Sequence, residues 1–115
     1  MSVRVFKIYT AAQWEARVSL GHLAWAPVDD TDGFVHLSSL EQVVETANKH
    51  FAGQIDLVLV EIDPAALPEG SLRWEVSRGG AKFPHVYATM PLASALEAWP
   101  FEAGQRGFSL PAALR

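Results

Sequence analysis

The sequence predicts a single α+β domain with a mixed, mostly antiparallel β-sheet and two helices in its N-terminal half. Segments with alternating or continuous apolar residues, which are typical of strands, outnumber those with helical spacing. Both helical segments come early in the chain. No linker or change of composition divides the 115 residues, and a chain of this length buries about two thirds of its unfolded surface. We therefore expect one domain over residues 1–115.

The first strand and the first helix are predicted close to the N-terminus. Residues 3–9 read as a strand that has Val3, Val5, Lys7 and Tyr9 on one face and Arg4, Phe6 and Ile8 on the other. Thr10 and Gln13 have the spacing of a capping box, so Thr10 should begin a helix that Gly21 ends. Residues 22–33 are rich in turn-forming side chains, and we expect them to be irregular.

A short strand and the second helix follow. The segment 34–38 has the composition of a strand, and a serine at position 38 or 39 is expected to cap the helix behind it. Apolar residues recur there at helical spacing and should face the core: Leu40, Val43, Val44, Ala47 and Phe51.

Strands dominate the second half. Residues 55–63 are apolar on both faces through most of their length, which indicates a central strand. Residues 71–77 alternate, and 83–90 should return as a strand after a glycine-containing turn. Residues 94–102 suit either a short helix or a last strand, and Pro100 favours the strand. The tail from residue 107 has no periodic pattern.

Composition excludes several classes of function. A net charge of −4 argues against binding a nucleic-acid polymer, although a small nucleotide needs only one or two local cations. The absence of cysteine excludes disulfides, thiolate metal sites and a cysteine nucleophile. The N-terminal segment resembles no signal peptide, and no stretch has the length of a membrane span. We expect a cytoplasmic protein that takes a small-molecule ligand.

Three predicted strands carry polar side chains that can meet on one face. His36 shares its face with Phe34 and Ser38, while Arg73 with Glu75 and His85 with Tyr87 form two further pairs. If these strands are neighbours, they offer a cation, a carboxylate and two imidazoles to one ligand. The alternative is that each pair faces solvent separately and only supports the sheet.

Two other kinds of site are weaker predictions. His36, His50, His85 and Glu75 are suitable metal ligands, but no closely spaced pair of them is present, so we expect no metal site and keep metal-dependent hydrolysis as a minor alternative. Ser38 and Ser39 lack the surroundings of a nucleophilic serine.

Several segments, taken in order and spacing, carry a family resemblance. They are "FKIYTAAQW", "DGFVHLSSLEQVVETANKHF", "DLVLVEID", "LRWE" and "GGAKFPHVY". The chain resembles the family catalogued as domain of unknown function 952 (DUF952) from about Val3 to beyond Tyr87. That family is similar to the ADP-ribosyltransferase fold, whose members bind NAD or a phosphorylated nucleotide in a cleft of a split β-sheet.

The resemblance implies positions for the site residues. Lys7 falls where the superfamily has a ribose-contacting His on the first strand, and His36 falls where a residue lines the nicotinamide pocket. Glu75 or His85 stands near the position of the late-strand Glu that aids glycosidic cleavage. NAD or a related nucleotide is the cofactor or ligand that this implies.

These observations lead to one main hypothesis and one alternative. The main hypothesis is a site for a nucleotide-like or phosphorylated ligand, with His36, Glu75 and His85 as catalytic residues if the protein is an enzyme acting on an N-glycosidic bond. The ligand-binding residues would be Lys7, Ser38, Arg73, Tyr87 and Trp14. Lys7 and Arg73 would meet the anionic part of the ligand. The alternative is a non-catalytic module that binds a ligand or another protein.

Overall fold

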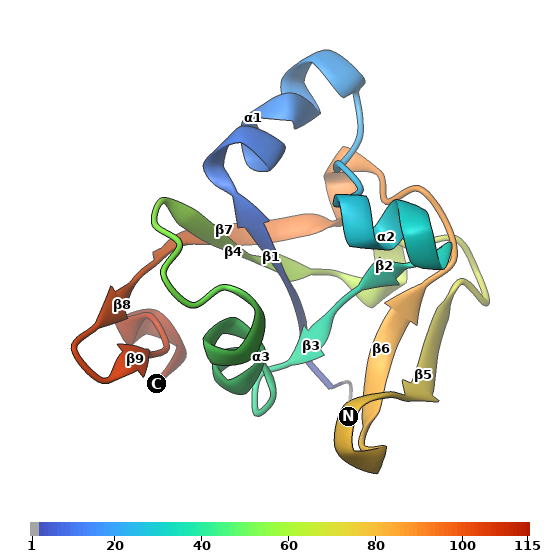
Figure 1. Cartoon of the computed structure of the whole chain (residues 1–115). Coiled ribbons are helices and arrows are strands. Elements are labelled where there is room, and N and C mark those ends of the chain that lie inside the picture. Colours follow the sequence, from blue (N-terminus) through green and yellow to red (C-terminus); the bar gives the residue numbers. More distant parts are fainter. Residues whose placement is uncertain (1–2) are drawn as a thin grey trace.

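The computed structural model describes residues 3–115, so the first two residues of the expected domain lie outside the described residues. Two antiparallel sheets form its framework (Figure 1). The four-stranded sheet has the order β3 (Ser38–Ser39), β1 (Val5–Thr10), β4 (Leu57–Ile62) and β7 (Ala95–Phe101). The three-stranded sheet has the order β2 (Val35–His36), β6 (Lys82–Val86) and β5 (Leu72–Val76). The predicted α+β class with mostly antiparallel sheets is confirmed.

The four-stranded sheet is covered on both faces, which explains the apolar character of its central strands. On β1, Val5 and Tyr9 pack with apolar residues of β2 and β6, whereas Phe6 and Ile8 pack with residues of the third helix and the C-terminal segment. Side chains alternate along a strand, so Lys7 lies on the same face as Val5 and Tyr9. The lysine therefore points into the space between the two sheets, where it is buried.

Three α-helices lie in the described part of the chain: α1 (Ala11–Leu20), α2 (Pro27–Asp32) and α3 (Val43–His50). The capping box of Thr10 and Gln13 and the C-cap at Gly21 are as predicted. Helix α2 corrects the prediction that residues 22–33 are irregular. Its six residues are too few to show apolar periodicity. Its start is marked by a proline in the first turn and by a hydrogen bond that the Ala26 N–H donates to the Asp29 carboxylate.

The start of α3 also differs from the prediction. Ser38 and Ser39 pair with β1 as strand β3, opposite Phe6 and Val5, so neither serine caps the helix. The side chain of Gln42 accepts a hydrogen bond from the Ser39 N–H instead. Pairing with a distant strand here outweighs the local preference of serine for a helix cap.

The three-stranded sheet presents its polar side chains on one face. His36 on β2 lies opposite His85 on β6, and His85 lies opposite Arg73 on β5. Glu75 follows Arg73 by two positions and Tyr87 follows His85 by two, so alternation gives all five the same face. On the other face Val35, Leu72 and Val86 join the apolar core, whereas Trp74 is exposed. The three strands are therefore neighbours, which is the condition for a shared polar face.

The C-terminal part confirms one prediction and adds elements that the sequence does not reveal. Residues 95–101 form strand β7, as Pro100 favours. The tail contains a small hairpin of β8 (Ala103–Gly104) and β9 (Gly107–Phe108), which packs beside α3 (Figure 1). Short 3₁₀ turns occupy Pro64–Ala66, Arg78–Gly80, Leu92–Ser94 and Ala112–Leu114. Within residues 3–115, no helix has the length and apolarity to cross a membrane.

Candidate functional site

A cleft of about 470 Å³ lies over the polar face of the three-stranded sheet, between α2 and α3. This volume is within the range of small-molecule sites. Its polar lining residues are Asp32, His36, Thr46, His50, Ser77 and His85. Its apolar walls are Val28, Leu37, Phe51 and Phe83. The cleft thus joins apolar walls to a few polar groups, including two of the three predicted catalytic residues.

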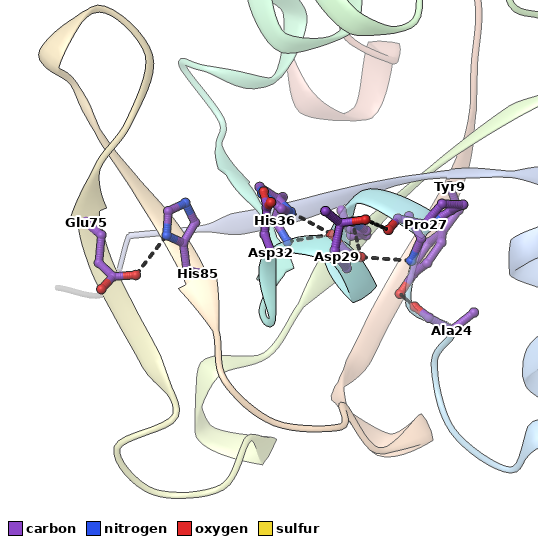
Figure 2. A network of polar contacts seen from close by, with 11 residues as sticks. Tyr9, Ala24, Pro27, Asp29, Asp32, His36, Glu75 and His85 are labelled. Atoms are coloured by element: carbon purple, nitrogen blue, oxygen red, sulfur yellow. Dashed lines mark hydrogen bonds and ion pairs between the residues drawn. The ribbon is translucent and has the colours of Figure 1, made fainter.

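His36 is held between two carboxylates. Its Nδ1 lies 2.7 Å from Oδ1 of Asp29, and its Nε2 lies 2.9 Å from Oδ2 of Asp32 (Figure 2). A carboxylate only accepts hydrogen bonds, so both contacts are hydrogen bonds when both ring nitrogens carry protons, as in the imidazolium form. Asp29 lies behind the ring in the protein, whereas Asp32 lies on the cleft side.

Asp29 is a fully buried carboxylate that accepts five hydrogen bonds from four donor atoms, because Nζ of Lys7 contacts both of its oxygens. Besides Nδ1 of His36 it accepts bonds from the backbone N–H of His36, the N–H of Ala26 and Nζ of Lys7, the last at 2.9 Å. Burial acts to raise the pKa of Asp29, but the bonds from His36 and Lys7 and the charge of Lys7 together lower it. These hydrogen bonds and the charge of Lys7 favour the ionised form of this buried carboxylate.

Lys7 is the buried cation of the same network. Burial lowers its pKa, against the opposing effect of the Asp29 carboxylate. Its ammonium group also lies 5.8 Å from the centre of the Tyr9 ring, whose hydroxyl donates to the Ala24 carbonyl. Lys7 is buried in the ion pair with Asp29 and does not line the cleft.

His85 is oriented by a second carboxylate. Its Nδ1 lies 2.9 Å from Oε1 of Glu75, and the same oxygen accepts a 2.6 Å hydrogen bond from the Tyr87 hydroxyl. The bonds from Tyr87 and from His85 lower the pKa of Glu75, and the bond to Glu75 raises the pKa of Tyr87. Glu75 thus acts on His85 from the far side of the ring and is not among the cleft-lining residues.

Phe34 joins the two histidines. Its ring stacks on His85 at a centroid distance of 4.1 Å and lies 4.6 Å from the centre of His36. The two imidazoles are 5.6 Å apart, centre to centre, and meet at an angle of 64°. Contacts of this kind hold the rings in place, so both imidazoles are fixed by a carboxylate and by an aromatic side chain.

The other predicted ligand-binding residues lie at different distances from the cleft. The guanidinium carbon of Arg73 lies over the Tyr87 ring, 4.9 Å from its centre. Ser38 is buried, and its hydroxyl lies 3.1 Å from Oγ1 of Thr46, which lines the cleft. Trp14 is on α1, packs against Tyr9 and borders a separate shallow hollow. The structure brings His36 and His85 together in the cleft, whereas none of the five predicted ligand-binding residues lines it: Lys7, Trp14, Ser38, Arg73 and Tyr87.

Sequence reasoning misses Asp29 and Asp32, which contact His36 most closely. Both belong to the segment expected to be irregular, where aspartates are common turn residues. Among residues 3–115, no group of three or more metal-ligating side chains is placed to hold a metal ion.

Comparisons with known proteins identify relatives. Residues 8–98 match the family model described as "Protein of unknown function (DUF952)". A crystal structure of protein CC0527 from Caulobacter crescentus is 38% identical, has a TM-score of 0.87 and covers 96% of this chain and 97% of its own. A solution NMR structure of CC0527 is 40% identical, with a TM-score of 0.77 over 91% of this chain and 90% of its own. No curated protein gives a significant match. The chain therefore belongs to the DUF952 family.

Proposed function

We propose that the cleft binds a small phosphorylated, nucleotide-like molecule and that His36 and His85 make its polar contacts. The observation that carries this proposal is the pair of imidazoles on one cleft, each held through Nδ1 by a carboxylate. A carboxylate at Nδ1 keeps the proton there and turns the other ring nitrogen toward a ligand. Imidazolium N–H groups are strong donors to phosphate oxygens.

The cleft offers a polar surface to one part of the ligand and an apolar surface to another. The histidines, with Thr46 and Ser77, face hydroxyl or phosphate oxygens, while Phe51 and Phe83 offer apolar surface to a base or another flat ring. Lys7 and Arg73, the cations expected to meet the phosphate, are bound to Asp29 and stacked on Tyr87 respectively. The imidazoles take the role of these cations in the proposal.

NAD and ADP-ribose are the first ligands to test, because the sequence motifs lead us to expect a resemblance to ADP-ribosyltransferases. If the protein is an enzyme, the reaction is transfer or hydrolysis at an N-glycosidic bond, with His36 and His85 supplying acid–base chemistry. Glu75 would then act by positioning His85, since its carboxylate accepts the bonds from His85 and Tyr87.

Calorimetric titration with ADP-ribose tests the binding step. We expect saturable binding to the wild-type protein and at least a tenfold loss of affinity in His85→Asn. His22→Asn is the matched control, because His22 lies in a loop and is not among the cleft-lining residues. No saturable binding of ADP-ribose or NAD to the wild-type protein would contradict the proposal, as would equal affinities of the two variants.

Chromatography of NAD incubated with the protein separates an enzyme from a binding module. Release of nicotinamide by the wild-type protein, and its loss in His36→Asn, is the result expected of an enzyme. Binding without release would favour the non-catalytic alternative.

A further inference from the structure

Asp32 makes a contact that the binding proposal does not yet use. It is the last residue of α2, its side chain is 42% exposed, and Oδ2 lies 2.9 Å from Nε2 of His36. Asp32 also lines the cleft. The nitrogen through which His36 would meet a ligand is therefore occupied by a carboxylate of the protein itself.

The charges around His36 suit its ring to contact an anionic group of a ligand. Asp29 faces the buried ammonium of Lys7, so the carboxylate behind the ring already has a cationic partner. Asp32 supplies a second negative charge, directed at the outer N–H of the imidazolium. The other titratable groups lining the cleft are His50 and His85, and both are potential cations. This end of the cleft thus combines N–H donors with one exposed carboxylate.

Asp32 contributes little to its own helix at this position. A negative charge at the C-terminal end of a helix meets the negative end of the helix dipole, which is unfavourable. Its side chain is partly in solvent, whereas Asp29 on the same helix is fully buried and fixed by five hydrogen bonds. Of the two carboxylates on His36, Asp32 is the one that can rotate away at low cost.

From these contacts we infer that the Asp32 carboxylate occupies the position of an oxyanion of the ligand, and that the ligand displaces it from Nε2 of His36. The inference rests on the proposed function and names the contact by which the cleft recognises the anionic part of its ligand. A phosphate group or a carboxylate group can supply such an oxyanion. Asp32 competes with it and so sets the affinity and selectivity of the cleft.

The test compares Asp32→Asn with Asp30→Asn, which removes the same charge from an exposed neighbour outside the cleft. The probes are inorganic phosphate and acetate, titrated at a pH of about 5.5, below the ordinary imidazole pKa of about 6.5. Binding is followed by the NMR signals of the His36 ring. We expect Asp32→Asn to bind phosphate about fivefold more tightly than the wild-type protein, the factor for removing a competing charge about 4 Å away in water. Asp30→Asn should match the wild-type protein.

The acetate titration identifies the source of the oxyanion. A larger gain for phosphate than for acetate in Asp32→Asn indicates a phosphorylated ligand, and the reverse indicates a carboxylate ligand. Asp32→Ser removes the same carboxylate and should give the same gain in phosphate affinity. Agreement of the two variants would show that the gain comes from the loss of the carboxylate and not from the new side chain.

Two results overturn the inference. Unchanged or weaker binding in Asp32→Asn and Asp32→Ser, with phosphate still shifting His36 in the wild-type protein, refutes the role of Asp32 and leaves the proposed function standing. No shift of His36 or His85 by phosphate, acetate or ADP-ribose in any form of the protein refutes both.

Discussion

Oδ1 of Asp29 lies 2.7 Å from Nδ1 of His36 and 3.1 Å from its backbone nitrogen. One buried carboxylate therefore fixes both the ring and the main chain of a cleft-lining histidine. Oδ2 of the same carboxylate binds Lys7, so the orientation of His36 depends on an ion pair that joins β1 to α2. This network links the stability of the fold to the geometry of the candidate site.

The first prediction concerns the buried ion pair. Asp29→Asn leaves the ammonium of Lys7 buried without its counter-charge, so we expect the free energy of unfolding to fall by about 3–5 kcal/mol. The double variant Lys7→Met/Asp29→Asn removes both charges and should lose less than the sum of the single losses, by about 1–3 kcal/mol. Urea denaturation of the wild-type protein, Lys7→Met, Asp29→Asn and the double variant measures this difference.

The exposed ion pair of Arg4 and Glu61 is the control. Its shortest contact is 2.8 Å, but the Arg4 side chain is 47% exposed. Arg4→Met should therefore cost about 1 kcal/mol or less. Additive losses for Lys7 and Asp29, or a loss for Asp29→Asn as small as that of Arg4→Met, would show that the buried pair is not coupled in this way.

The second prediction is a dependence of stability on acid pH. The folded-state pKa of Asp29 lies below the unfolded value of about 3.9, so the unfolded chain binds more protons in the window between the two values. The contribution of Asp29 to stability is thus complete above that unfolded value and is lost as the pH falls through the folded one. Between pH values of about 5 and about 2.5, the wild-type protein should lose more stability than Asp29→Asn. Equal losses, measured by urea denaturation at each pH, would count against an ionised Asp29.

The third prediction uses the two tyrosines of the chain, Tyr9 and Tyr87. The hydrogen bond to Glu75 raises the pKa of Tyr87, and burial raises that of Tyr9. In Glu75→Gln the pKa of Tyr87 should fall toward the ordinary phenol value of about 10. The pKa of Tyr9 should stay raised. Absorbance of the phenolate during an alkaline titration reads both groups. If Tyr87 titrates alike in both proteins, Glu75 does not hold its hydroxyl.

The polar face of the three-stranded sheet could be predicted from the sequence. Alternation along each strand survives in the folded protein, so His36, His85, Arg73, Glu75 and Tyr87 share a face as their spacing indicates. The short turn between β5 and β6 makes those strands neighbours. Local sequence does not specify that β2 joins them, so from the sequence a face shared by all three strands is only a conditional expectation.

The environment of Lys7 could not be predicted in the same way. A lysine in an alternating strand usually marks the solvent face, but β1 is covered on both sides. Its counter-charge, Asp29, lies in a helix too short to show a period. The site therefore depends on a pairing between distant segments that only the fold reveals.

The NMR signals of the four histidine rings during titration with ADP-ribose test the central claim most directly. His36 and His85 line the cleft, whereas His22 does not and serves as an internal reference. The account predicts that the ring signals of His36 and His85 shift saturably with one common dissociation constant. The ring signal of His22 should not shift. Shifts of His22 as large as those of His36, or no saturable shift of His36 and His85, would contradict it.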